Sequence, residues 1–169
     1  MDILDLLHPR DVYVRKLATA KRPLLRQFAD HFADRSRLPP DVVFAALLNR
    51  ERLGSTGIGN GVALPHAFVH HKPSAALAIL QRPIWFRTPD GLPVDIVLAV
   101  IWPRDHAMEF MQALSRVCRL LSRSELRENI RCASSPEEVL TRLQDAVDGR
   151  PGEPALAMLA GQTRREGRL

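Results

Sequence analysis

Cysteine is scarce in this chain of 169 residues, in which Cys118 and Cys132 are the only two. They are fourteen positions apart, and neither belongs to a C-x-x-C pair or has a neighbouring histidine. Disulfide frameworks and zinc sites are built from closer clusters of ligands. The sequence therefore argues against both, and we expect neither a metal nor a cofactor.

Long apolar runs are also missing. No segment approaches the roughly 18 apolar residues that a membrane span requires. The first ten residues, MDILDLLHPR, carry acidic side chains where a secretory signal peptide needs basic ones. We therefore expect a cytoplasmic protein that does not insert into a membrane.

Lysine is rare: the basic residues are 21 arginines and three lysines, against 19 acidic residues, for a net charge of +5. Two of these five net positive charges fall in residues 149–169, and the others are dispersed. No block of like charges and no basic helix interleaved with aromatic residues is present, so the pattern gives nucleic-acid binding little support. Binding of nucleic acid by the arginine-rich tail is the weakest of the functional hypotheses.

Alternating strand and helix patterns predict an α/β domain over residues 1–148. Strands are expected at residues 12–17, 62–64, 75–80 and 93–102, and the last is apolar enough to be buried on both faces. Asp90 and Gly91 predict a turn before this strand. The composition changes after Asp148, so residues 149–169 are expected to form a flexible, arginine-containing tail.

Helix signals occupy much of the remaining chain. Pro23 is expected at the first position of a helix that ends before Leu38, and a second helix is expected over residues 41–52, closed by Gly54 in a left-handed cap. A third helix is expected after Asp105, where an apolar stripe comprises Ala107, Phe110, Leu114, Val117 and Leu121. The sequences SRSE (122–125) and SPEE (135–138) have capping-box spacing and predict two more helices.

Residues 53–66, LGSTGIGNGVALPH, place four glycines before His66 and contain no acidic residue. One interpretation is an irregular turn that leads to a hydrogen-bonded core histidine. The spacing fits neither a P-loop, which needs a Lys-Ser or Lys-Thr pair, nor the dinucleotide-binding fingerprint. A second interpretation is an anion site formed by backbone amides that the glycines free.

The anion-site interpretation assigns a role to each polar group near His66. Backbone N–H groups, hydroxyls and one guanidinium would hold phosphate oxygens, and the residues that supply them are Gly57, Gly59, Ser55, Thr56 and Arg50. A neutral imidazole beside such a site has a nucleophilic nitrogen at physiological pH. His66 is therefore the expected phosphoryl acceptor, with the surrounding donors stabilising charge on the transferred group.

Residues 48–66, LNRERLGSTGIGNGVALPH, resemble the active-site sequence of enzyme IIA domains of the fructose, mannitol and nitrogen class of the phosphoenolpyruvate phosphotransferase system. The resemblance continues through residues 82–84, 90–97, 103, 120–121 and 125–127, and covers roughly residues 1–147. It implies a mixed β-sheet flanked by helices on both faces. It also implies a phosphoryl carrier in which His66 is the acceptor, Arg50 is the active-site arginine, and a histidine phosphocarrier protein is the donor.

No permease segment or sugar-binding region accompanies the domain in these 169 residues. The resemblance therefore favours the nitrogen-branch regulator over the IIA component of a fructose- or mannitol-type transporter. The downstream regulatory target or separate permease partner stays open at this point.

Two features depart from the family pattern. The family's second histidine, which faces the reactive one, aligns with Phe110, and a phenyl ring can neither orient an imidazole nor share a proton. His106, one helical turn earlier on the same expected face, is a candidate for partial replacement. Ala67 and Phe68 follow His66 where the family has a small residue and then a basic one. The main alternative function is accordingly a regulatory binding module with impaired phosphotransfer.

The remaining histidines lie outside this pattern. His66 and His70 have H-x-x-x-H spacing, but metal binding by this spacing requires a helix, and Pro65 argues against one. We therefore expect His70 and His71 in an exposed loop and predict no metal at them.

Overall fold

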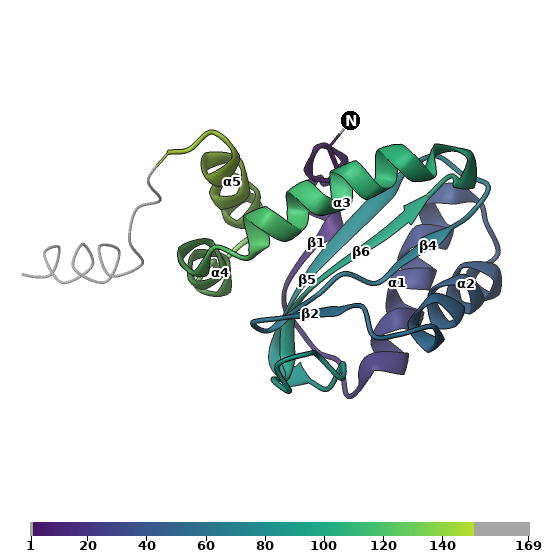
Figure 1. The fold of residues 1–169 in the computed structure, drawn as a ribbon, viewed down its shortest axis with the longest axis horizontal. Coiled ribbons are helices and arrows are strands. Elements are labelled where there is room, and N and C mark those ends of the chain that lie inside the picture. Colours follow the sequence, from purple (N-terminus) through teal and green to yellow (C-terminus); the bar gives the residue numbers. More distant parts are fainter. Residues whose placement is uncertain (1, 151–169) are drawn as a thin grey trace, which may run out of the picture.

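A six-stranded mixed sheet with helices on both faces forms the framework of residues 2–150, which are the part of the chain that the computed structural model describes (Figure 1). The strands are β1 (Val12–Lys16), β2 (Gly57–Gly59), β3 (Val62–Ala63), β4 (His66–Phe68), β5 (Ser74–Ile84) and β6 (Val94–Trp102). The helices are α1 (Lys21–Ser36), α2 (Pro40–Arg52), α3 (Ala107–Leu121), α4 (Ser124–Arg131) and α5 (Pro136–Val147), with short 3-10 turns at Leu4–Leu6, Pro9–Asp11 and Arg104–His106.

The sheet has the order β1-β5-β6-β3-β2, and β4 also pairs with β6. Strand β5 is antiparallel to β6 and parallel to β1, whereas β3 and β4 are both parallel to β6. Val62 and Ala63 of β3 pair with Ile96 and Val97, and His66 of β4 pairs with Val100 further along β6. The predicted mixed sheet is confirmed, and β6 is the strand that fixes where His66 lies.

Strand β6 is buried on both faces because its alternating side chains enter two separate cores. Ile96, Leu98 and Val100 belong to a core beneath α3, α4 and α5, whereas Val97 and Ala99 belong to a core beneath α1 and α2. Figure 1 shows α3 lying across one face of the sheet, with α1 and α2 on the other. This burial explains the nearly continuous apolar sequence of the strand.

Strand and helix limits differ from the sequence predictions in places. Strand β5 extends to Ile84, four residues beyond the predicted end. Helix α1 begins at Lys21, so the prediction that Pro23 takes the first helical position is wrong; Pro23 is the third residue. Proline is tolerated there because the N–H groups of a first helical turn have no intrahelical acceptor.

Of the two predicted capping boxes, only the second caps the N-terminus of a helix. The Ser135 side chain caps α5 by accepting a hydrogen bond from the Glu138 N–H at 3.2 Å, with Pro136 at the first position. Ser122 instead ends α3, and its hydroxyl donates to the Arg119 carbonyl at 2.7 Å. Helix α4 therefore starts at Ser124 without the side-chain cap that the sequence predicted.

The glycine-rich segment is largely a hairpin, which the sequence analysis missed. Strands β2 and β3 pair antiparallel, and Asn60 and Gly61 join them with φ values of +55° and +78°. Positive φ at both central residues defines a type I′ turn, the geometry for which Asn-Gly is the preferred sequence. Gly54 lies two residues after the end of α2 and has a φ of +151°. It therefore does not adopt the left-handed helical conformation, with φ near about +57°, that the sequence predicted for a helix cap.

The predicted tail over residues 149–169 lies almost entirely outside the described residues. Of its members, Gly149 and Arg150 are described, and the Arg150 N–H donates to the Asp145 carbonyl at 2.8 Å.

Gly61 is the glycine whose replacement should distort the hairpin most. A Cβ at this position would lie 2.5 Å from Arg131 Nη2 and 2.8 Å from Asp95 Oδ1. Gly91 has a similar φ of +68° but nothing within 4 Å of an added Cβ, so it is the matched control. We expect Gly91→Ala to lose about 1–2 kcal/mol of unfolding free energy, from the backbone alone.

Gly61→Ala should lose at least about 1 kcal/mol more, because the added methyl also displaces the Arg131–Asp95 pair. Urea denaturation of both variants measures this difference. Equal losses would show that the contact with Arg131 does not constrain the turn.

Candidate active site

His66 and Arg50 meet at the carboxyl end of β6. His66 is the first residue of β4, and Arg50 lies in the last turn of α2. Arg50 Nε–H donates to His66 Nε2 at 2.9 Å, and Arg50 Nη1 donates to the Gly54 carbonyl at 3.0 Å. The two predicted catalytic residues are therefore in direct contact, and the second hydrogen bond of Arg50 fixes the direction of its guanidinium.

The partners of the two ring nitrogens determine the tautomer of His66. Nδ1 lies 2.8 Å from the Leu64 carbonyl, which only accepts hydrogen bonds, so Nδ1 carries the proton. Nε2 faces a guanidinium N–H, which only donates, so Nε2 presents its lone pair. The nitrogen available for nucleophilic attack is consequently Nε2.

The pKa of His66 is lowered from its ordinary value, mainly because burial disfavours the imidazolium. The Leu64 carbonyl opposes this shift by accepting from Nδ1–H, whereas the charge of Arg50 lowers the pKa further. The imidazole is therefore neutral at physiological pH, as a nucleophilic nitrogen must be.

Phe110 supplies the apolar wall beside His66. Its ring centroid lies 5.1 Å from that of His66, and it also contacts Phe68 and Trp102. With 1% of its surface exposed, Phe110 belongs to the core and adds no polar group to the site. The position that aligns with the family's second histidine therefore faces His66.

The side chain of His106 contacts Glu109 and not His66. Its Nδ1 lies 2.9 Å from Glu109 Oε1, and its side chain is half exposed. The pKa of His106 is raised by the hydrogen bond and the charge of Glu109. In this arrangement His106 does not replace the missing second imidazole, because Glu109 holds its half-exposed ring just before the start of α3.

The sequence analysis missed Glu51, a buried carboxylate next to Arg50. Its carboxylate accepts from the Thr56 hydroxyl at 2.6 Å, from the Thr56 N–H at 3.2 Å and from Lys21 Nζ at 2.8 Å. Glu51 therefore ties the end of α2 to the start of α1 and to the segment that leads into β2. No local motif marks this role, since a glutamate between two arginines on a helix is an ordinary surface pattern.

Three of the residues predicted to bind phosphate, Ser55, Thr56 and Gly57, donate to partners within the chain. Thr56 donates twice to Glu51, the Gly57 N–H donates to Ser55 Oγ at 3.1 Å, and the Ser55 hydroxyl donates to the Phe86 carbonyl. Gly59 lies in β2, where an added Cβ would meet the Asp90 carboxylate at 3.0 Å. The described conformation therefore uses this segment to shape the hairpin, and Arg50 is the cation that contacts His66.

The other histidines lie away from this site. His70 is exposed, and His71 Nδ1 bonds to the Lys72 carbonyl at 3.0 Å. His31 is held between Tyr13 and the buried Asp11, at 2.7 Å and 3.1 Å. Across residues 2–150, no three His, Cys, Asp or Glu side chains are grouped so that they could hold a metal ion.

Comparison with known proteins assigns the family that this fold and site define. Residues 5–146 match the family described as "Phosphoenolpyruvate-dependent sugar phosphotransferase system, EIIA 2". The chain therefore belongs to this family of enzyme IIA domains and is a phosphotransferase component. None of the helices within residues 2–150 has the length and apolar character needed to cross a membrane.

Among its relatives are proteins named for nitrogen regulation. The chain is 36% identical over 137 residues to the nitrogen regulatory protein of Escherichia coli, covering 79% of this chain and 83% of that protein. It is 32% identical over 145 residues to the nitrogen regulatory protein of Bradyrhizobium diazoefficiens, covering 85% and 95%. The crystal structure of nitrogen regulatory protein IIA-Ntr from Neisseria meningitidis superposes with a TM-score of 0.80 at 30% identity, covering 83% and 98%.

Glu51→Gln should destabilise the domain, because it removes the charge that Lys21 and Thr56 surround. We expect a loss of about 2 kcal/mol of unfolding free energy, as for a buried hydrogen bond to a charged group. Glu128→Gln is the matched control, since Glu128 pairs with Arg131 on the surface and is 67% exposed. Its loss should stay under about 1 kcal/mol. Urea denaturation compares the two, and equal losses would contradict the positioning role of Glu51.

Proposed function

We propose that the protein carries a phosphoryl group on Nε2 of His66, accepted from a histidine phosphocarrier protein in the cytoplasm, and that it acts in the nitrogen branch of the phosphotransferase system. The observation that carries the proposal is the pair of hydrogen bonds that fixes Nδ1–H on Leu64 and turns the Nε2 lone pair toward Arg50. The assignment to the nitrogen branch of the phosphotransferase system is supported by relatives named as nitrogen regulatory proteins, which match over most of their length.

The transfer step uses these groups as follows. The Nε2 lone pair forms a bond to phosphorus while the donor's P–N bond breaks, and the donor imidazole keeps that electron pair. His66 then becomes an imidazolium whose Nδ1–H stays hydrogen bonded to the Leu64 carbonyl, which stabilises the charged ring. No proton has to leave His66 before attack, because Nε2 carries none.

Arg50 has a different acceptor before and after transfer. In the free protein its Nε–H binds the Nε2 lone pair, and the P–N bond consumes that lone pair. The guanidinium then turns to the phosphoryl oxygens, which it fits as a charge-assisted donor. The segment between α2 and β3 supports this reorientation of the Arg50 guanidinium indirectly. Four of its residues hold that segment in place: Ser55, Thr56, Gly57 and Gly59.

Phe110 bears on the main alternative, a binding module with impaired transfer. Its ring cannot share a proton with His66, but attack by Nε2 requires no proton acceptor on that side. The apolar contact contributes to the burial that lowers the pKa of His66. Phosphoryl acceptance therefore does not depend on a second histidine, and the same chemistry would also serve a separate sugar-transport partner.

Incubation with phosphoenolpyruvate, the first enzyme of the relay and a matching phosphocarrier tests the proposal. We expect an acid-labile, base-stable phosphoryl adduct that is absent from His66→Ala and present in His70→Ala, since His70 lies in the exposed loop. Arg50→Met should slow formation of the adduct by about 100-fold, the effect typical of one lost electrostatic donor. No adduct under conditions that label a related enzyme IIA would favour the binding module instead.

A further inference from the structure

Aromatic side chains cover the α3 side of His66. The Phe110 ring centroid lies 5.1 Å from that of His66, and Phe68 and Trp102 pack around Phe110 with centroid distances of 5.5 Å and 5.6 Å. Phe110 and Trp102 are each 1% exposed, so they shield this side of the imidazole from solvent. The side chains of Phe68, Trp102 and Phe110 thus form an aromatic wall beside His66.

The side chains of the aromatic wall present no hydrogen-bond acceptor to His66. Their only polar atom, Trp102 Nε1, is a donor. This N–H is buried and has no hydrogen-bond partner among residues 2–150. Buried N–H groups nearly always bind an acceptor where one is in reach, so the unpartnered indole indicates that apolar groups surround it.

The acceptors near the polar edge of His66 are already engaged. The Leu64 carbonyl accepts from His66 Nδ1–H, and the Gly54 carbonyl accepts from Arg50, which itself only donates. The Glu51 carboxylate, whose charge acts on His66, is buried and accepts from a hydroxyl and an ammonium group. The described contacts of His66 therefore leave its surroundings rich in donors and poor in acceptors.

The shortage of acceptors matters once His66 carries a phosphoryl group, because water competes with a protein partner for that group. In hydrolysis a lone pair of the water oxygen forms a bond to phosphorus while the P–Nε2 bond breaks, and Nε2 keeps that electron pair. One proton of the water passes to an acceptor. A positioned side chain that accepts this proton, or that orients the water, speeds such a reaction by about 10²–10⁴-fold.

From the aromatic wall and the engaged acceptors we propose that Phe110 determines which acceptor takes the phosphoryl group from His66. Its phenyl ring fills a position next to the imidazole where a polar side chain would activate water. The group therefore stays on His66 until a protein partner supplies its own nucleophile. This role of Phe110 rests on the proposed phosphoryl-carrier function, and it makes Phe110 the residue that sets the lifetime of the phosphohistidine.

The lifetime of the phosphohistidine in the full-length protein tests this role. The protein is phosphorylated from labelled phosphoenolpyruvate through the relay and separated from its donor, and the loss of label is followed at neutral pH. We expect the folded phosphoprotein to lose its label at least about tenfold more slowly than the same phosphoprotein unfolded in urea, because unfolding opens the aromatic wall to water. This comparison needs no substitution.

Two substitutions place a hydrogen-bond acceptor in the aromatic wall. In Phe110→His and Phe110→Gln, a side chain that can orient water replaces the phenyl ring. Each should shorten the lifetime of the phosphohistidine at least about tenfold. Phe110→Leu keeps the position apolar, so its phosphohistidine should last as long as that of the unmodified protein.

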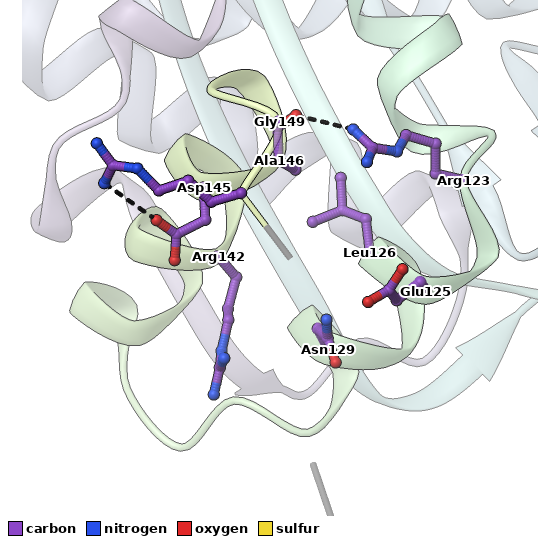
Figure 2. Close-up of a pocket in the computed structure, with 9 residues that line it drawn as sticks. Arg123, Glu125, Leu126, Asn129, Arg142, Asp145, Ala146 and Gly149 are labelled. Atoms are coloured by element: carbon purple, nitrogen blue, oxygen red, sulfur yellow. Dashed lines mark hydrogen bonds and ion pairs between the residues drawn. The ribbon is translucent and has the colours of Figure 1, made fainter. Parts of the chain in front are cut away.

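Leu126→His is the matched control for a general disturbance of the core. Leu126 is 4% exposed and lines the hollow between α4 and α5 (Figure 2). It belongs to the same core as Phe110, but α3 runs for roughly 16 Å from Phe110 to its last residue, Leu121, before α4 begins. Leu126→His therefore buries the same imidazole away from His66, and the lifetime should not change.

Several results would overturn the role of Phe110. These are a folded lifetime no longer than that in urea, equal lifetimes in the unmodified protein, Phe110→His and Phe110→Gln, or a shortening in Phe110→Leu or Leu126→His as large as that in Phe110→His. If the unmodified protein forms no phosphoryl adduct, the phosphoryl-carrier function fails and the role of Phe110 fails with it. The two failures are therefore distinguishable.

Discussion

The hydrogen bond from Arg50 Nε to His66 Nε2 is the interaction on which the rest of this site depends. It requires a lone pair on Nε2, and the Leu64 carbonyl requires the proton on Nδ1, so the two contacts select one tautomer together. Burial and the Arg50 charge both lower the pKa of the ring, which keeps the lone pair available at neutral pH. A single fixed imidazole nitrogen is what a phosphoryl carrier needs.

Much of the surrounding fold serves to hold these two residues against one another. Strand β6 pairs with both β3 and β4, so the backbone on either side of Leu64 and Pro65 is anchored to one buried strand. Glu51 binds Lys21 and Thr56 and thereby fixes the end of α2, where Arg50 lies. The glycines matter mainly for the hairpin between these anchors, since Asn60 and Gly61 reverse the chain with positive φ values.

The sequence predicted the site and the central strand best, because a specific motif marks the first and a continuous apolar run marks the second. The motif around His66 predicted that His66 and Arg50 share one site, where the two residues are in direct contact, and the apolar run of residues 93–102 predicted the central strand. The hairpin was missed although Asn60-Gly61 is a strong turn signal, because the glycines on either side of Ile58 hid β2, while β3 alone was predicted. Ser122 does not cap the N-terminus of α4, because α3 extends to Leu121 and Ser122 is its C-cap. Glu51 could not be predicted, because its partners come from α1 and from the segment beyond α2.

The state of the His66 ring is the most direct test of this account. ¹⁵N NMR of histidine-labelled protein distinguishes a protonated ring nitrogen from one with a free lone pair. At neutral pH we expect Nδ1 to be protonated and Nε2 to be unprotonated. The midpoint of the titration should lie below the ordinary histidine value of about 6.5, and it should be higher in Arg50→Met. A proton on Nε2, or a midpoint above that value, would contradict the account.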